Sequence, residues 1–165
     1  MNVQITLTDE QVKLLSKDLI KAGVKLPEPL KITDRVKTFD DALKIYQETS
    51  YLSPLRKELL NYIGPDEETL SSQASEQLKI IAEVLNEGWT PDWNNSSEYK
   101  YYPYFDMRNN TLVYSYCNFS FWNVSSYAGS RLCFKTSALA EYAGKQFIEI
   151  YKQSFMLYHS CVSLK

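Results

Sequence analysis

The sequence predicts an α+β fold: a mainly helical first half, followed by a small antiparallel sheet of about three strands with a C-terminal helix packed on it. Apolar residues up to Leu85 recur at helical spacing, whereas those beyond Trp89 fall into shorter, alternating runs. The aromatic residues divide the chain at the same place, because 19 of the 23 lie between Trp89 and Tyr158. We therefore expect a helical region over 1–88 and an aromatic sheet-and-helix module over 89–158, packed together as one domain.

Four helices are predicted in the first half, each by a capping residue followed by apolar side chains at helical spacing. They are expected to begin at Thr8, Thr38, Ser53 and Asp66. Residues 24–37 contain Pro27 and Pro29 and are expected to form a connector. The polar run at 71–73 limits the secure part of the fourth helix to about 74–87.

In the second half, three strands and one helix are predicted. The strands are expected at Tyr99–Met107, Leu112–Phe121 and Arg131–Lys135, with a turn at Asn109 and Asn110 and a loop over 123–129. A final helix is expected to be capped by Ser137 and to turn Phe147 toward the core. Gly144 inside this helix would be explained by close packing of the helix on the sheet, which we favour, or by an external partner. Residues 159–165 are expected to fray.

The charge of the chain is small and uneven. The net charge is -2, which gives no general attraction to phosphate or to an anionic membrane. Residues 1–88 carry 11 Lys/Arg and 15 Asp/Glu, whereas residues 89–165 carry 7 and 5. The aromatic half is therefore weakly basic, which is too little to predict a nucleic-acid patch.

Three cysteines, Cys117, Cys133 and Cys161, show neither a C-x-x-C pair nor the spacing of a disulfide scaffold. No signal peptide and no run of about 18 apolar residues is visible, so we expect a cytoplasmic protein with free thiols and no membrane contact. No nucleotide-binding motif and no cluster of Cys and His occurs. We therefore expect no cofactor and no metal.

Four strings in the aromatic half resemble a known family. They are Trp89-x-Pro91-Asp92-Trp93, Lys100-Tyr101-Tyr102-Pro103-x-Phe105, Gly129-Ser130-Arg131-Leu132-Cys133-Phe134-Lys135 and Leu139-Ala140-Glu141-Tyr142-Ala143-Gly144-Lys145-Gln146-Phe147. Together they look like a family of small uncharacterised proteins encoded by phages, prophages and mobile elements of gut bacteria, and the resemblance covers about residues 78–157. The resemblance implies a phage-related setting in the cytoplasm of a bacterial host cell. It implies no activity and no catalytic residues.

Trp89, Asp92 and Trp93 are the first candidate binding residues. The two indoles, four residues apart, are suited to form a platform for a base, a sugar or a partner side chain, with Asp92 as a hydrogen-bond acceptor. The competing interpretation is a loop anchored by two buried indoles, with Asp92 capping its turn. Because large aromatic side chains usually supply packing area, we favour the anchored loop.

Lys100, Tyr101 and Tyr102 are the next candidates, on the first predicted strand. Tyrosines on both faces of a strand suit a surface that is half in water, so one exposed aromatic surface is expected there. The alternative is a set of tyrosines with buried rings and hydroxyl groups in solvent.

Arg131 completes the candidate set, because a guanidinium can hold a phosphate or a carboxylate with two hydrogen bonds. More often, such an arginine ties a loop through backbone carbonyls or through a carboxylate such as Asp106, and we favour that role.

The sequence contains no recognisable catalytic motif. His159 is the only histidine and lies in the predicted tail, which argues against a catalytic triad or a Cys-His pair. We therefore predict a non-enzymatic protein that binds a host or phage protein through the aromatic surface around residues 89–105. The first alternative is a single-strand nucleic-acid binder that stacks bases on the same rings, and the second is an enzyme that uses Asp92, Tyr101 and Arg131.

Overall fold

The computed structural model describes residues 21, 30–108, 111–121 and 131–155 and divides the chain into two units, Met1–Lys31 and Ile32–Lys165. In the first unit, Lys21 is helical and exposed, and Lys31 is exposed. Four predicted features lie outside the described residues: most of the helix from Thr8, the turn at 109–110, the loop over 123–129 and the tail at 159–165.

The second unit begins with four helices: α2 (Ile32–Arg35), α3 (Phe39–Thr49), α4 (Pro54–Leu60) and α5 (Glu67–Leu85). The predicted caps are in place, since side chains of Thr38, Ser53 and Asp66 accept hydrogen bonds from backbone N–H groups in the first turns of α3, α4 and α5. The helix α2, a single turn, lies in the segment 24–37 that was predicted as a connector.

The long helix α5 is continuous through the polar run at 71–73, where the sequence suggested a break. Gln73 explains why, because its side chain is buried and points inward rather than competing with the helix backbone. Its Nε2 donates to the carbonyl oxygens of Leu59, Leu60 and Tyr62 at 2.9–3.1 Å. A polar residue on α5 thereby holds the end of α4 against the core.

The sheet has two strands among the described residues, β1 (Lys100–Arg108) and β2 (Thr111–Ser120), paired antiparallel with a bulge at Tyr104/Phe105. The predicted third strand at Arg131–Lys135 is wrong, because the segment is reduced to one isolated bridge between Tyr101 and Phe134. Pro103, two residues along β1 from Tyr101, has no N–H with which to continue the ladder. On the side of the segment that faces away from β1, the Asn86 side chain donates to the Cys133 carbonyl at 2.8 Å and accepts from the Lys135 N–H at 2.9 Å.

The final helix is split in two. It is capped by Thr136 rather than Ser137 and runs as α6 (Ser137–Gln146) and α7 (Ile148–Phe155). Phe147 separates the two with φ -110° and ψ 28°, outside the helical region. Phe147 is nevertheless buried, as is Tyr151 on α7, so both pieces contribute to one core.

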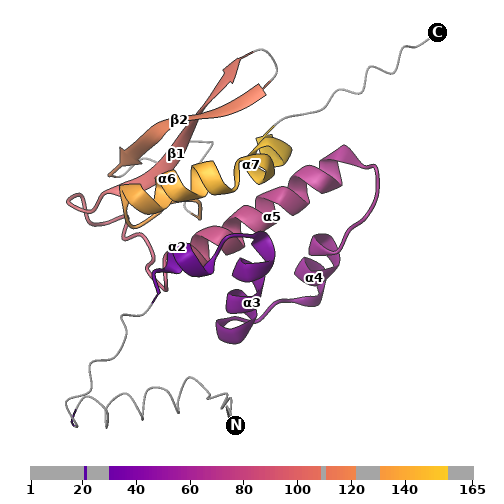
Figure 1. The fold of residues 1–165 in the computed structure, drawn as a ribbon, viewed down its shortest axis with the longest axis horizontal. Coiled ribbons are helices and arrows are strands. Elements are labelled where there is room, and N and C mark those ends of the chain that lie inside the picture. Colours follow the sequence, from indigo (N-terminus) through magenta and orange to yellow (C-terminus); the bar gives the residue numbers. More distant parts are fainter. Residues whose placement is uncertain (1–20, 22–29, 109–110, 122–130, 156–165) are drawn as a thin grey trace, which may run out of the picture. The chain divides into compact units, whose positions relative to one another are not determined.

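The core of this unit lies between the helices and the inner face of the hairpin (Figure 1). Helix α6 packs on β1 and β2, and α7 packs on α5, which in turn contacts α3 and α4. The sheet and α6 approach closely at Gly144, where a Cβ atom would lie 2.6 Å from the Tyr114 ring and 2.7 Å from Pro103. This contact explains the glycine inside the helix. No helix in the described part of the chain is long and apolar enough to cross a bilayer.

Candidate functional site

The segment from Asn86 to Glu98, here called the tryptophan loop, leaves the end of α5 and leads toward β1. Its first turn needs left-handed backbone angles, with φ 49° at Glu87 and φ 83° at Gly88. The Trp89 N–H then donates to the Asn86 carbonyl at 3.0 Å. Because Asn86 also holds Cys133 and Lys135, the start of the loop is fixed to the segment that bridges to β1.

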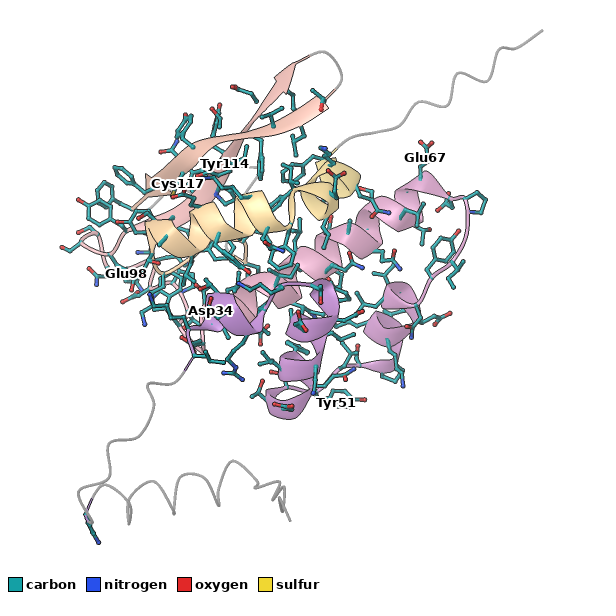
Figure 2. The ribbon with its side chains drawn as sticks, viewed as in Figure 1. Asp34, Tyr51, Glu67, Glu98, Tyr114 and Cys117 are labelled. Carbon is teal, nitrogen blue, oxygen red and sulfur yellow. The ribbon has the colours of Figure 1, made fainter. Side chains whose placement is uncertain are left out.

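The carboxylate of Glu98, which is labelled in Figure 2, organises the rest of the tryptophan loop. One oxygen accepts from Trp89 Nε1 at 3.3 Å, and the other accepts from the Asp92 N–H at 2.9 Å and pairs with Lys100 Nζ at 3.2 Å. Partial burial acts to raise the pKa of Glu98, but these hydrogen bonds and the Lys100 charge outweigh it and hold the pKa below its usual value of 4.5. A single carboxylate therefore closes the loop on itself.

Lys100 is the fully buried centre of this arrangement. Its Nζ donates to the carbonyl oxygens of Asn95 and Glu98, both at 3.0 Å, and lies 5.5 Å from the centre of the Trp93 ring. With the Glu98 carboxylate, these groups use all three donors of the ammonium. Lys100 was a candidate binding residue, but its charge is enclosed by its own loop and does not face an external ligand.

Trp89, Asp92 and Trp93 have the geometry of an anchored loop rather than of an open platform. Both indoles are partly buried, and each is tied to a polar group of the loop, Trp89 to Glu98 and Trp93 to Lys100. Asp92 is exposed, and its Oδ1 accepts from the Asn94 N–H at 2.9 Å, which is a turn-capping bond. These three residues build the loop.

Exposed aromatic rings gather instead on the hairpin, at the end where β1 begins and β2 stops. Tyr99, Tyr101, Phe119 and Phe121 form what we call the aromatic cluster, with ring centres 4.8–6.3 Å apart. Tyr99, Phe119 and Phe121 are 45%, 47% and 38% exposed. The cluster is on the face of the hairpin that also carries Pro103, farther along toward α6.

The opposite face of the hairpin carries a second group, the tyrosine pair. Tyr104 and Tyr116 are cross-strand neighbours whose rings stack with centres 4.7 Å apart. They are 40% and 47% exposed, and the strand register places the exposed Val113 on the same face. The aromatic cluster and the tyrosine pair thus flank β2 on both sides.

The candidate residues of the strand are not brought together on one surface. Tyr101 is half-buried in the aromatic cluster, whereas Tyr102, the next residue, points to the other face. Partial burial raises the pKa of the Tyr102 hydroxyl. Arg131 is exposed, in the segment that leads to the Phe134 bridge.

The strand β2 and the residue that follows it supplied side chains that the sequence argument did not select. Phe119, Phe121 and Tyr116 carry much of the exposed aromatic surface, although the candidate set stopped before β2. The available signal was the density of aromatic residues over 112–121 together with its pairing to the tyrosines of β1. Cross-strand pairing joins rings of two separate runs on each face of the hairpin, which an argument from one strand cannot show.

The described thiols lie in apolar surroundings. Burial raises the pKa of the half-buried Cys117, and it raises the pKa of the buried Cys133 to about 11. Figure 2 shows Cys117 beside Tyr114, where the hairpin meets α6. Among the described residues, no three Cys, His, Asp or Glu side chains are grouped as metal ligands would be. The thiols therefore have the character of packing residues.

Comparison with protein-family models, with curated protein sequences and with solved structures found no match for this chain. The resemblance to phage and mobile-element proteins therefore stays a prediction.

Proposed function

We propose that the chain is a non-enzymatic protein-binding module whose interaction surface is the aromatic cluster and the tyrosine pair of the β1–β2 hairpin. One observation carries the proposal: five exposed aromatic side chains lie on the two faces of one hairpin. They are Tyr99, Tyr104, Tyr116, Phe119 and Phe121. Aromatic residues are enriched in the centres of protein interfaces, where charged residues are depleted. Their few rotatable bonds make them inexpensive to immobilise in a complex.

The electrostatics favour a protein over a single-stranded nucleic acid. A base-stacking surface needs cations beside its rings to hold the phosphates. The lysine best placed in the sequence for this, Lys100, is enclosed in the tryptophan loop. Arg131 and Lys135 are exposed on the segment bridged to Tyr101, and they are the reason to test nucleic acid directly.

The setting of this binding belongs to the proposal as well. The resemblance implies a phage-related or mobile-element protein in the cytoplasm of a bacterial host, so the partner would be a host or phage protein. The anchored tryptophan loop then has a supporting role. It holds the start of β1, next to the aromatic cluster, in a fixed position.

The test compares two probes on the same variants. A random peptide display library, panned on the purified chain, should yield peptides that bind the wild type but not Tyr104→Ala or Phe119→Ala. Tyr51→Ala is the matched control, because Tyr51 is 79% exposed beyond the end of α3. Labelled oligothymidylate should bind weakly at both low and high salt.

Two outcomes would contradict the proposal. One is a library that yields no binding peptide. The other is micromolar or tighter oligonucleotide binding that falls steeply with salt and is lost in Phe119→Ala.

A further inference from the structure

The strand β2 has an inner edge paired with β1 and an outer edge. Tyr101 shows which peptide groups point to each edge, because its N–H and C=O bond to Phe134, away from β2. Tyr101 and its partner Phe119 are therefore a pair that exchanges no hydrogen bonds, and alternation places Pro103 and Cys117 in the same class. The N–H and C=O groups of Cys117 and Phe119 consequently point to the outer edge of β2.

The side chain of Asn118 supports this assignment. Its Oδ1 accepts the Phe119 N–H at 2.8 Å, a donor that a third strand would otherwise engage. Within the described part of the chain, the sheet ends at β2 on this side. The amide of Asn118 thus satisfies an edge donor that has no strand beside it.

The two edges of the hairpin differ. On the outer edge of β1, Phe134 occupies the peptide groups of Tyr101, and Pro103 has no N–H to offer. On the outer edge of β2, the N–H and C=O of Cys117 bond to no other described residue. The edge that accepts another strand is therefore that of β2.

Aromatic rings stand on both sides of this edge. Phe119 belongs to the aromatic cluster on one face, and Tyr116 belongs to the tyrosine pair on the other. A strand laid along β2 would direct alternate side chains to these two faces. Backbone groups between two apolar faces are the arrangement by which sheet edges bind extended peptides.

We propose that the outer edge of β2, from Tyr116 to Phe119, receives an extended segment of a partner polypeptide as a third strand. This inference rests on the proposed function and specifies the form of the partner. The peptide groups of Cys117 match another peptide backbone, with its alternating N–H and C=O, rather than a sugar-phosphate chain. The segment would carry apolar or aromatic side chains at alternate positions.

A second copy of this chain fits the edge less well. The bulge at Tyr104/Phe105 interrupts the β2 ladder, and Asn118 covers one edge donor. Bulges and covered edge donors are devices that limit the pairing of one sheet edge with its own copy. The bulge and the Asn118 side chain together leave only a short part of the β2 edge open, and this length suits a short segment of another protein.

The experiment removes one outward N–H from the full chain. Cys117→Pro deletes the donor on the outer edge but leaves the ladder to β1 intact, since Cys117 and Pro103 exchange no hydrogen bonds. Cys117→Val is the matched control, because it loses the thiol but retains the N–H. The probe is the tightest peptide selected from the random display library on wild-type protein. Circular dichroism and the melting temperature check that both variants fold.

Loss of about three- to tenfold in affinity is expected for Cys117→Pro, with Cys117→Val within about twofold of wild type. A scan of the peptide with N-methyl groups should weaken binding at every second residue. This scan tests the inference from the ligand side even where Cys117→Pro does not fold. Equal effects at successive peptide residues would overturn it, as would equal affinity for folded Cys117→Pro and wild type.

The remaining outcomes separate this inference from the proposed function. Peptide binding that is lost in Phe119→Ala but lacks the alternating N-methyl pattern leaves the aromatic surface as the binding site and overturns the added strand. A library that yields no peptide contradicts both. Sedimentation of the chain alone should show a monomer. A dimer that dissociates in Cys117→Pro would show that a second copy, not a foreign segment, occupies the edge.

Discussion

The tryptophan loop and the aromatic hairpin are neighbours in sequence and use the same kind of residue in opposite ways. In the loop, each ring is tied to a polar group: Trp89 to the carboxylate of Glu98, and Trp93 to the ammonium of Lys100. In the aromatic cluster and the tyrosine pair, rings contact other rings and remain more than a third exposed at five positions. The difference shows that the polar groups around a ring, more than the ring itself, decide whether it builds structure or offers a surface.

The largest expected effect falls on the core that supports both regions. Phe147→Ala should lower the free energy of unfolding by about 3–5 kcal/mol, because it leaves a cavity at the junction of α6 and α7. Urea denaturation measures this. Both the loop and the hairpin should lose their structure in one transition. An unchanged midpoint would mean that the junction packs less tightly than its burial indicates.

Lys100→Met should affect the tryptophan loop alone. The substitution retains much of the side-chain volume but removes the charge that satisfies two carbonyl oxygens and Glu98, at a cost of about 3 kcal/mol. Tryptophan emission in a Trp122→Phe background reports the loosening of Trp89 and Trp93. A red shift in emission is expected. Stability equal to wild type would show that the loop does not need its buried cation.

Acid should open the loop in the same manner. The pKa of Glu98 is lowered in the folded state, so its stabilisation is complete above the usual value of 4.5 and is lost as the pH falls through the lowered value. Wild-type tryptophan emission should therefore change at acidic pH. Glu98→Gln is the matched control, because a neutral amide removes this step while other carboxylates still titrate. The same acid transition in both proteins would assign it to another group.

Substitutions in the tyrosine pair should have a small effect on stability. Tyr104→Ser or Tyr116→Ser removes one exposed ring of a stacked pair, which should cost about 1 kcal/mol or less. Binding of the selected peptide should nevertheless be lost. The ratio of the two effects, from thermal melts and titrations, distinguishes a binding surface from a structural one. Destabilisation as large as that expected for Lys100→Met would show that the tyrosine pair has a structural role, as the tryptophan loop does.

The smallest effect concerns the thiols and leaves stability unchanged. In a Cys161→Ser background at pH 8, both cysteines should react slowly with a thiol reagent, because burial raises both pKa values. Cys133, under the tryptophan loop with its pKa at about 11, should react more slowly than Cys117 at the hairpin. Mass spectrometry of labelled peptides gives the order. Faster labelling of Cys133 would show that the loop opens more readily than the hairpin.

The sequence alone determined the mixed α+β character and most of the described elements. The capping residues Thr38 and Ser53 predicted the first residues of α3 and α4 correctly, because a cap is a hydrogen bond within a single helical turn. The alternation of the two β runs placed β1 and β2 to within about a residue, since a strand face is also local information. Short-range patterns were sufficient wherever the stabilising contact was itself short-range.

Tertiary structure decided the features that depend on distant partners. Asn86 holds the segment that was predicted as a third strand by bonding to Lys135 and to Cys133, which lies 47 residues away in sequence. Gln73 keeps α5 continuous by bonding to the end of α4, and packing at Phe147 divides one predicted helix into two. Lys100 is the clearest case, because an isolated strand pattern places a lysine in water. The loop folded over it supplies the carbonyls and the carboxylate that make its burial possible.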